Sequence, residues 1–228
     1  MRDGLLFDFG GTLDADGVPW ADRFFAVYRR AGGRLDRTAF TAAFRASDER
    51  LAETPGIRQC GFAAMIERQA AILQDLLPDG YLVPQHGMAE RFVTDARLMA
   101  ARNRPVLAAL AARHRLGIVS NFTGNLVPCL VELGFIEFFD VVQDSAVVGV
   151  AKPAPAIFLG ALAALDLPAS RCWMVGDNPS ADLAPAQALG LRTCWLAPAG
   201  RPAGDCRPTA RIAHLTDLPE ALQWAPLD

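Results

Sequence analysis

Lysine is nearly absent from this sequence. Lys152 is the only one among 228 residues, so any mechanism that needs a second lysine is excluded. The five cysteines stand singly, without C-x-x-C spacing, which indicates neither a zinc ribbon nor a disulfide framework. A reducing cytoplasm is therefore the expected compartment.

Long apolar runs and an excess of either charge are also missing. No segment approaches the roughly 18 apolar residues of a membrane span, and acids flank the first apolar run, so we expect neither a signal peptide nor a membrane helix. A formal net charge of −3 gives no reason to expect a nucleic-acid or membrane surface. The chain is long enough for one core domain plus an inserted one, and small molecules are the expected partners.

Short apolar runs next to turn or helix signals predict buried strands. Between most of them, apolar residues recur with helical periodicity. Strands that alternate with helices in this way form βαβ units, so we predict an α/β fold with a parallel sheet covered on both faces. The predicted strands are residues 5–9, 116–120, 140–142, 172–176, 193–196 and, more weakly, 210–213.

One interval breaks the alternation. Residues 14–98 contain no convincing strand, but four stretches carry apolar residues on one helical face, and Asp36 is placed to cap the second. We therefore predict a helical domain over residues 14–98, inserted into an α/β core domain of residues 1–13 and 99–228.

Polar side chains stand where the predicted strands end, which is where ligands bind in an open parallel sheet. Carboxylates near a hydroxyl and one ammonium suit a hard divalent cation and a phosphate, and Mg²⁺ prefers oxygen ligands of this kind. The candidates are Asp8 after the first strand, Ser120 and Asn121 after the second, Lys152 in the loop after the third, and Asp177 and Asp182 after the fourth.

The loop after Asp8 adds a possible anion contact. Gly10, Gly11 and Thr12 follow it directly, and glycines let backbone N–H groups face an anion at little steric cost. Lys152 would neutralise charge on both a phosphate and the nucleophile.

Several of these residues also have a structural interpretation. Asp182 is placed to cap a helix, Ser120 and Asn121 are common turn residues, and Asp177 stands in a turn sequence. These alternatives stay open at the level of the sequence.

Four segments together resemble the ordered motifs of the haloacid dehalogenase superfamily: "DFGGTLD", "GIVSNF", "GVAKPAPAIF" and "VGDNPSAD". The resemblance covers residues 5–13 and about 99–228. It implies a Rossmann-like core, and the helical insertion resembles the superfamily's cap of the first type.

The resemblance also implies roles for individual residues. Asp8 would be the nucleophile that forms an aspartyl-phosphate. Mg²⁺ would lie between Asp8, the carbonyl of Gly10 and Asp177, with Asp182 supporting it through water or through Lys152.

Phosphate contacts follow in the same way. Ser120 would bond a phosphoryl oxygen, and Lys152 would hold the phosphate and the nucleophile together. Gly11, Thr12 and Asn121 are the expected substrate contacts.

Gly10 departs from the pattern of the family's phosphatases, which usually carry a second aspartate there. That aspartate protonates the leaving oxygen and later activates water, a contribution of about 10²–10⁴-fold. We predict a Mg²⁺-dependent phosphatase that takes its acid from the cap or from Asp14, or that acts on an ester with a good leaving group.

Two alternatives remain. Dehalogenases and phosphonatases of the superfamily also lack the second acid, but phosphonatases need a cap lysine, and residues 14–98 have none. Dehalogenases work without magnesium, and they resemble this chain less in the segment "GDNPSAD", whose two acids indicate a metal site. A non-catalytic module that binds metal and phosphate is the other alternative, and the complete set of remaining site residues argues against it.

Substrate choice would be made by the cap, which closes over the site and excludes water. Arg50, Arg58 and Gln59 are candidates to meet an anionic or polar substrate, although charged residues of this kind are more often solvated. Asp14 and Asp16 are expected to be solvated acids at the hinge into the cap.

Overall fold

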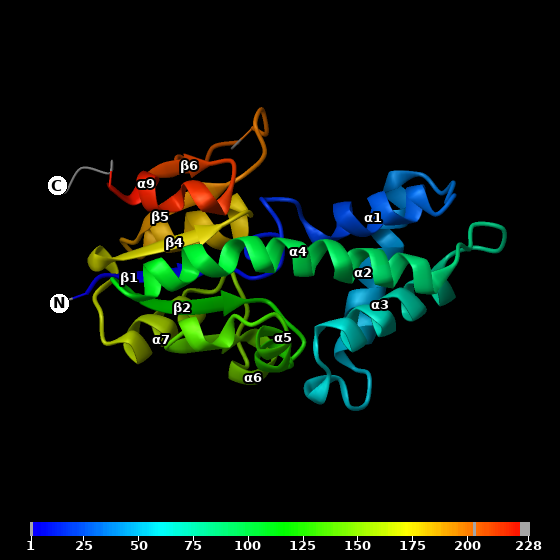
Figure 1. Cartoon of the computed structure of the whole chain (residues 1–228), viewed down its shortest axis with the longest axis horizontal. Coiled ribbons are helices and arrows are strands. Elements are labelled where there is room, and N and C mark those ends of the chain that lie inside the picture. Colours follow the sequence, from blue (N-terminus) through cyan, green and yellow to red (C-terminus); the bar gives the residue numbers. More distant parts are fainter. Residues whose placement is uncertain (1, 203, 224–228) are drawn as a thin grey trace.

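A computed structural model describes residues 2–202 and 204–223. Its centre is a sheet whose strands all run parallel, in the order β3-β2-β1-β4-β5-β6 (Figure 1). This confirms the predicted α/β fold, and the strand order is that of a Rossmann-like sheet. The strands are β1 (Gly4–Phe7), β2 (Arg115–Ser120), β3 (Val141–Asp144), β4 (Cys172–Gly176), β5 (Arg192–Leu196) and β6 (Ala210–Ile212).

Helices cover both faces of the sheet, because successive side chains of a buried strand point to opposite faces. Leu5 and Phe7 of β1 belong to an apolar cluster with α4 (Gln85–Ala111) and α9 (Leu218–Gln223), whereas Leu6 packs in a second cluster with α7 (Pro155–Leu165) and α8 (Ala184–Ala188). Among the described residues, no helix combines the length and the apolar character needed to cross a bilayer. The helices after β2 are α5 (Leu126–Glu132), α6 (Ser145–Val148), α7 (Pro155–Leu165), α8 (Ala184–Ala188) and α9 (Leu218–Gln223).

The segment between β1 and β2 is helical, as its apolar periodicity predicts. Four helices pack together beside the sheet, and we call α1, α2, α3 and the first half of α4 the helical bundle (Figure 1). Asp36 caps α2 as predicted, since its Oδ1 accepts a hydrogen bond from the N–H of Ala39 at 3.0 Å. The helices are α1 (Trp20–Arg30), α2 (Arg37–Ala52), α3 (Phe62–Leu76) and α4 (Gln85–Ala111).

Helix α4 links the helical bundle to the sheet. The sequence predicts two helical stretches, around Phe92 and around Leu110, but the structure has one continuous helix that contains Pro105. A proline removes only one N–H donor, and the contacts of α4 with α1 and α3 on one side and β2 on the other hold the helix across it. The predicted domain boundary at residue 98 lies within this helix and stays a prediction.

One apolar cluster runs from the sheet into the helical bundle. Phe9, two residues beyond β1, makes edge-to-face contacts with Trp20 of α1, Phe62 of α3 and Phe122. Such contacts between buried rings favour a defined geometry. They fix the helical bundle over the carboxyl end of β1.

Candidate active site

The predicted site residues meet at the centre of the sheet's carboxyl edge. Asp8 directly follows β1 and Asp177 directly follows β4, and these neighbouring strands flank the point where the strand order reverses. Ligands bind at such switch points in open α/β sheets. Ser120 ends β2, and Lys152 lies in the loop before α7.

Lys152 is the centre of the hydrogen-bond network in this site. Its ammonium donates to Oδ1 of Asp8 at 2.6 Å and to Oδ1 of Asp182 at 2.7 Å, and the hydroxyl of Ser120 donates to Oδ1 of Asp8 at 3.1 Å. Burial opposes the charge of Lys152, but the carboxylates of Asp182 and Asp8 outweigh it and raise the pKa of Lys152 above its usual range. In the part of the chain that the structure describes, no donor reaches Oδ2 of Asp8.

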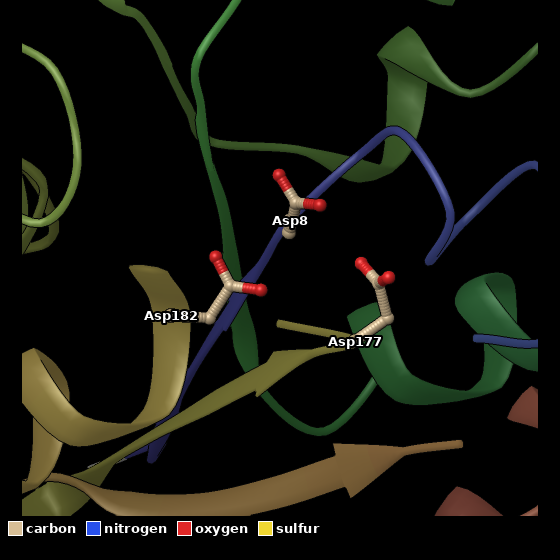
Figure 2. A group of neighbouring side chains, drawn as sticks. All are labelled: Asp8, Asp177 and Asp182. Carbon is tan, nitrogen blue, oxygen red and sulfur yellow. The ribbon is translucent and has the colours of Figure 1, made fainter. Parts of the chain in front are cut away.

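Three carboxylates surround a common space beyond β1 and β4 (Figure 2). Asp8, Asp177 and Asp182 each offer an oxygen within 4.8 Å of the others. Burial, and then repulsion by Asp8 and Asp182, raise the pKa of Asp177 to about 8. Lys152 forms ion pairs with Asp8 and Asp182. The cation paired with Asp177 is Arg201, whose Nη1 lies 4.0 Å from Oδ2 of Asp177. The arrangement is therefore suited to a divalent cation, which would relieve this repulsion.

Two glycines allow the carboxylates to come this close. Gly11 has φ +89°, and a Cβ on it would lie 3.0 Å from both carboxylate oxygens of Asp177. A Cβ on Gly176 would lie 2.4 Å from Oδ2 of Asp182. A side chain at either position would push the acids apart.

The N–H groups of the loop after Asp8 correct one expectation. These groups are not free for a bound anion, because the N–H of Gly11 donates to Oδ1 of Asp14 at 2.7 Å and that of Thr12 donates to the carbonyl of Phe9 at 3.1 Å. The hydroxyl of Thr12 lies 3.4 Å from Oδ1 of Asp177. The assignment of Gly11 and Thr12 as substrate contacts stays a prediction, and it would have to use other atoms.

Asn121 holds the loop that carries Lys152. Its Oδ1 accepts from the N–H of Lys152 at 2.7 Å, and its Nδ2 donates to the carbonyl of Lys152 at 3.0 Å. It also lines the cavity described below. Substrate contact by Asn121 stays a prediction, beside this observed support of Lys152.

The turn after β4 is capped by Asn178 rather than by Asp182. Oδ1 of Asn178 accepts from the N–H groups of Ser180 and Ala181, both at 3.1 Å. Asp182 uses Oδ2 to accept from the N–H of Asn178 at 3.0 Å and leaves Oδ1 to Lys152. The alternative that Asp182 is a simple helix cap is therefore wrong.

Trp20 fills the space beside Gly10. A Cβ on Gly10 would lie 3.2 Å from Nε1 and 3.4 Å from Cε2 of the Trp20 indole. That distance is tighter than an ordinary van der Waals contact, so a longer side chain requires the indole to move. Position 10 therefore lacks an acid, and the space that a side chain there would need is filled by Trp20 of α1.

Asp14 and Asp16 are not solvated acids, so that expectation was wrong. Asp14 is buried and forms an ion pair with Arg23, and Nε1 of Trp20 donates to its Oδ2 at 2.8 Å. Asp16 accepts two bonds of 2.6 Å from the guanidinium of Arg102. Both acids tie the loop after β1 to helices. They are not solvated because this loop passes between two packed regions and has little contact with water.

A cavity of about 500 Å³ opens between the site and the helical bundle. The sheet side supplies Asp8, Ser120 and Lys152, and the helical side supplies Trp20, Met65 and the C-terminal end of α2. Residues of α2 that line it are Asp48, Glu49, Leu51 and Ala52.

The helical residues expected to meet the substrate are not those that the structure brings to the cavity. Among the described residues, Arg50, Arg58 and Gln59 do not line it, and Nη2 of Arg58 instead approaches the carbonyl of Ala146 at 3.5 Å. Asp48 and Glu49 were missed, because "SDER" on an amphipathic helix predicts an exposed face. The structure leaves both residues exposed, as that pattern predicts, but the C-terminal end of α2 borders the cavity, and so they line it.

Comparison with known proteins gives consistent results. The family model described as haloacid dehalogenase-like hydrolase matches residues 3–190. The chain is 35% identical over 123 residues to phosphoserine phosphatase of Thermus thermophilus, with 50% of this chain and 49% of that protein covered. It is 36% identical over 121 residues to a pyrimidine 5'-nucleotidase of Escherichia coli, with 51% and 53% covered. The chain thus spans about half the length of these curated relatives.

Solved structures extend the likeness over the whole chain. The 2-haloacid dehalogenase of Pseudomonas syringae is 27% identical, with a TM-score of 0.57 over 99% of this chain and 100% of that one. A phosphatase from Thermococcus onnurineus, 20% identical with a TM-score of 0.52 over 96% and 97% of the two chains, shares the fold.

Proposed function

This chain belongs to the haloacid dehalogenase-like hydrolase family, and we propose that it is a Mg²⁺-dependent phosphatase of a small phosphorylated metabolite, with Asp8 as the nucleophile. The observation that carries the proposal is the set of hydrogen bonds to Asp8 and the position of its side chain in the cavity. Lys152 and Ser120 both donate to Oδ1, while Oδ2 accepts no bond from the described residues and the side chain lines the cavity. The relatives named phosphatase and nucleotidase support the same chemistry.

The acidic cluster fits Mg²⁺. We propose that Asp8, the carbonyl of Gly10 and Asp177 hold the ion and that Asp182 supports it through Lys152. The donors are hard oxygens, and the mutual repulsion of the carboxylates gives a divalent cation a favourable place. When bound, the ion would neutralise charge on the phosphoryl oxygens.

The residues of the chain then have the following tasks. Oδ2 of Asp8 attacks phosphorus, the bond between phosphorus and the leaving oxygen breaks, and the leaving oxygen takes up a proton. Ser120 and Lys152 bond the phosphoryl oxygens and the nucleophile, so that little reorganisation is needed during transfer. Water then attacks the phosphorus of the aspartyl-phosphate, which releases phosphate and restores Asp8.

The helical bundle is proposed as the cap. It covers the cavity from the side opposite Asp8, and Trp20 and Met65 give that wall an apolar character. Closure of such a cap over the cavity would limit hydrolysis to the bound substrate and strengthen the interactions of charged groups inside it.

Phosphoenzyme trapping tests the proposal. With Mg²⁺ and acetyl phosphate or 4-nitrophenyl phosphate, the chain should release phosphate and form an acid-stable, hydroxylamine-labile adduct on Asp8, detected by mass spectrometry. EDTA should abolish both. Asp8→Asn should lose both, whereas Asp75→Asn, an exposed α3 acid outside the cavity, should behave like the parent.

Two other results would replace the proposal. Metal-independent halide release from 2-haloacids would assign dehalogenation, an alternative kept because dehalogenases of the superfamily also lack the second acid and because the Pseudomonas syringae enzyme is similar over the whole chain. A rise in melting temperature with Mg²⁺ and beryllofluoride, without turnover of any ester or haloacid, would assign a binding module.

A further inference from the structure

The proposed reaction lacks an obvious proton donor. Position 10, directly beyond Phe9, is a glycine, and Trp20 occupies the adjoining space, so neither a side chain nor a simple shift of the loop supplies an acid there. An unactivated alkoxide is a poor leaving group, and a positioned acid contributes about 10²–10⁴-fold to such a step.

Asp14, the acid nearest in sequence, is unsuited to the task. Its Oδ1 accepts from the N–H of Gly11, and its Oδ2 accepts from Nε1 of Trp20 and from Arg23. The carboxyl group is buried and forms an ion pair with Arg23, so both of its oxygens are already bonded within the protein. Asp14 is moreover not among the described residues that line the cavity.

Few residues that line the cavity could donate a proton to the leaving group. No histidine, tyrosine or cysteine is among the described residues that line it. Asp8, Lys152, Asp177 and Asp182 form the cluster that binds metal and phosphate in the proposed reaction. The titratable groups that remain are Asp48 and Glu49, both on α2, which lines the same cavity as Asp8 from the helical side.

Asp48 is held in place, and Glu49 is not. Nε2 of Gln69, a fully buried residue of α3, donates to Oδ1 of Asp48 at 2.7 Å and to Oγ of Ser47 at the same distance. Within the described residues, Glu49 has no hydrogen bond or ion pair. A proton donor must be positioned to act in the transition state, and this favours Asp48.

We propose that Asp48 is the general acid and base of this phosphatase, in place of the acid missing at position 10. The assignment rests on the proposed function. As the bond between phosphorus and the leaving oxygen breaks, the carboxyl group of Asp48 gives its proton to that oxygen. The resulting carboxylate takes a proton from the water that attacks the aspartyl-phosphate, so the cycle returns Asp48 to its starting form.

The surroundings of Asp48 suit both halves of this cycle. Asp48 is an exposed residue that water reaches through the open cavity, while the protein packed around its carboxyl group disfavours the charged form and raises the pKa of Asp48 to about 7. Glu49 on the same helix raises it further, and the bond from Gln69 lowers it. Across the cavity it faces Lys152 and the three site carboxylates. A group with this pKa both gives and accepts a proton near neutral pH.

The test compares leaving groups. Asp48→Asn should lower kcat/KM by about 10²–10⁴-fold on an alkyl ester such as 2-phenylethyl phosphate, and by less than about 10-fold on 4-nitrophenyl phosphate and acetyl phosphate, whose leaving groups need little protonation. On the alkyl ester, the fall in kcat/KM above about pH 7 should vanish. Glu53→Gln, which removes an exposed acid just beyond α2 and outside the cavity, is the matched control.

Two further variants separate proton transfer from structural support. Asp48→Glu should keep part of the activity and the pH dependence. Gln69→Met removes the hydrogen bond that lowers the pKa of Asp48, so the fall in kcat/KM should move to higher pH. A residue that only supports the fold would not move this limb of the profile, and the second variant serves if Asp48→Asn is poorly folded.

The outcomes distinguish this inference from the proposed function. If the parent turns over none of the three esters, the proposed function fails. If the parent is active and Asp48→Asn lowers kcat/KM by the same factor on all three esters, Asp48 is not the proton donor. The same conclusion follows if the substitution raises KM and leaves kcat unchanged. Unchanged activity of Asp48→Asn on the alkyl ester would also overturn the inference.

Discussion

The two walls of the cavity are built differently. The charged residues of the sheet side are less than a tenth exposed. Asp8 and Asp182 lie within a few residues of a strand end, and Lys152 donates hydrogen bonds to both. On the helical side, aromatic and aliphatic residues predominate, and of the two α2 acids that line the cavity, Asp48 accepts a hydrogen bond from Gln69. In the proposed reaction, the sheet wall would supply the attacking group, and the helical wall would meet the leaving group.

This difference has a physical basis. Parallel strands end in register, so that charges there are held rigidly by the hydrogen-bonded sheet. The bundle is held over them by side-chain packing, which tolerates volume-conserving substitution better than a buried charge tolerates loss of its partner. Perturbations of the two walls should accordingly differ in kind and in size.

Lys152→Ala should have the largest effect. It leaves Asp8 and Asp182 as buried charges without a counter-ion, and the free energy of unfolding should fall by about 3–5 kcal/mol, with turnover lost. Urea denaturation and phosphate release measure the two effects. Lys152→Met combined with Asp182→Asn should recover much of the stability but no activity, and a loss below about 1 kcal/mol in the single variant would contradict the buried network.

Arg23→Ala tests the ion pair on the helical side. Asp14 keeps neutral donors from Gly11 and Trp20, so the loss should be smaller, about 1.5–3 kcal/mol, including the lost contact of the guanidinium with the Phe92 ring. At a temperature where the variant is folded, its turnover should exceed that of Lys152→Ala by far. Equal losses of turnover would mean that the two walls do not differ as described.

Gly10→Asp should not restore a faster enzyme, because the new side chain meets the Trp20 indole. Crowding of this kind costs about 1–3 kcal/mol. Combined with Trp20→Ala, the substitution should cost less than the sum of the single changes, and a double-mutant cycle from chemical denaturation measures the coupling. Additive costs would show that the indole does not restrict position 10.

Asp16→Asn should have the smallest effect and a defined pH dependence. Burial opposes ionisation of Asp16, but hydrogen bonds from Arg102, His214 and Leu215 outweigh it and lower its pKa from 3.8. A carboxyl with a lowered pKa contributes stability above its unfolded pKa and loses it as pH falls through the folded value. The parent should thus be about 1 kcal/mol more stable than the variant at pH 7, because the pair is partly exposed, and this advantage should shrink below about pH 4. A difference that persists to about pH 2 would point to another cause.

The sequence predicted the parts of this protein that depend on local pattern. Short apolar runs gave the sheet, helical periodicity gave the insertion, and Asp36 was predicted as the cap of α2. Asp8 and Asp177 were predicted to be neighbours, because both follow strands that a parallel sheet aligns at one edge.

Other features have no local signal. Asp14 was expected in solvent, but Arg23 and Trp20 from the next helix surround it. The continuity of α4 through Pro105 depends on packing at both ends. The position of Asp48 depends on how α2 is rotated against the sheet.

The amino-acid sequence by itself determined the layered fold and the charged edge of the sheet, since strand ends follow from hydrophobic patterning and from the parallel arrangement. Only the tertiary structure decided which residues of the helical bundle face that edge. The contact of Trp20 with Gly10 and the presence of Asp48 in the same cavity as Asp8 come from packing between segments distant in the chain, and no periodicity within one segment encodes such a relation.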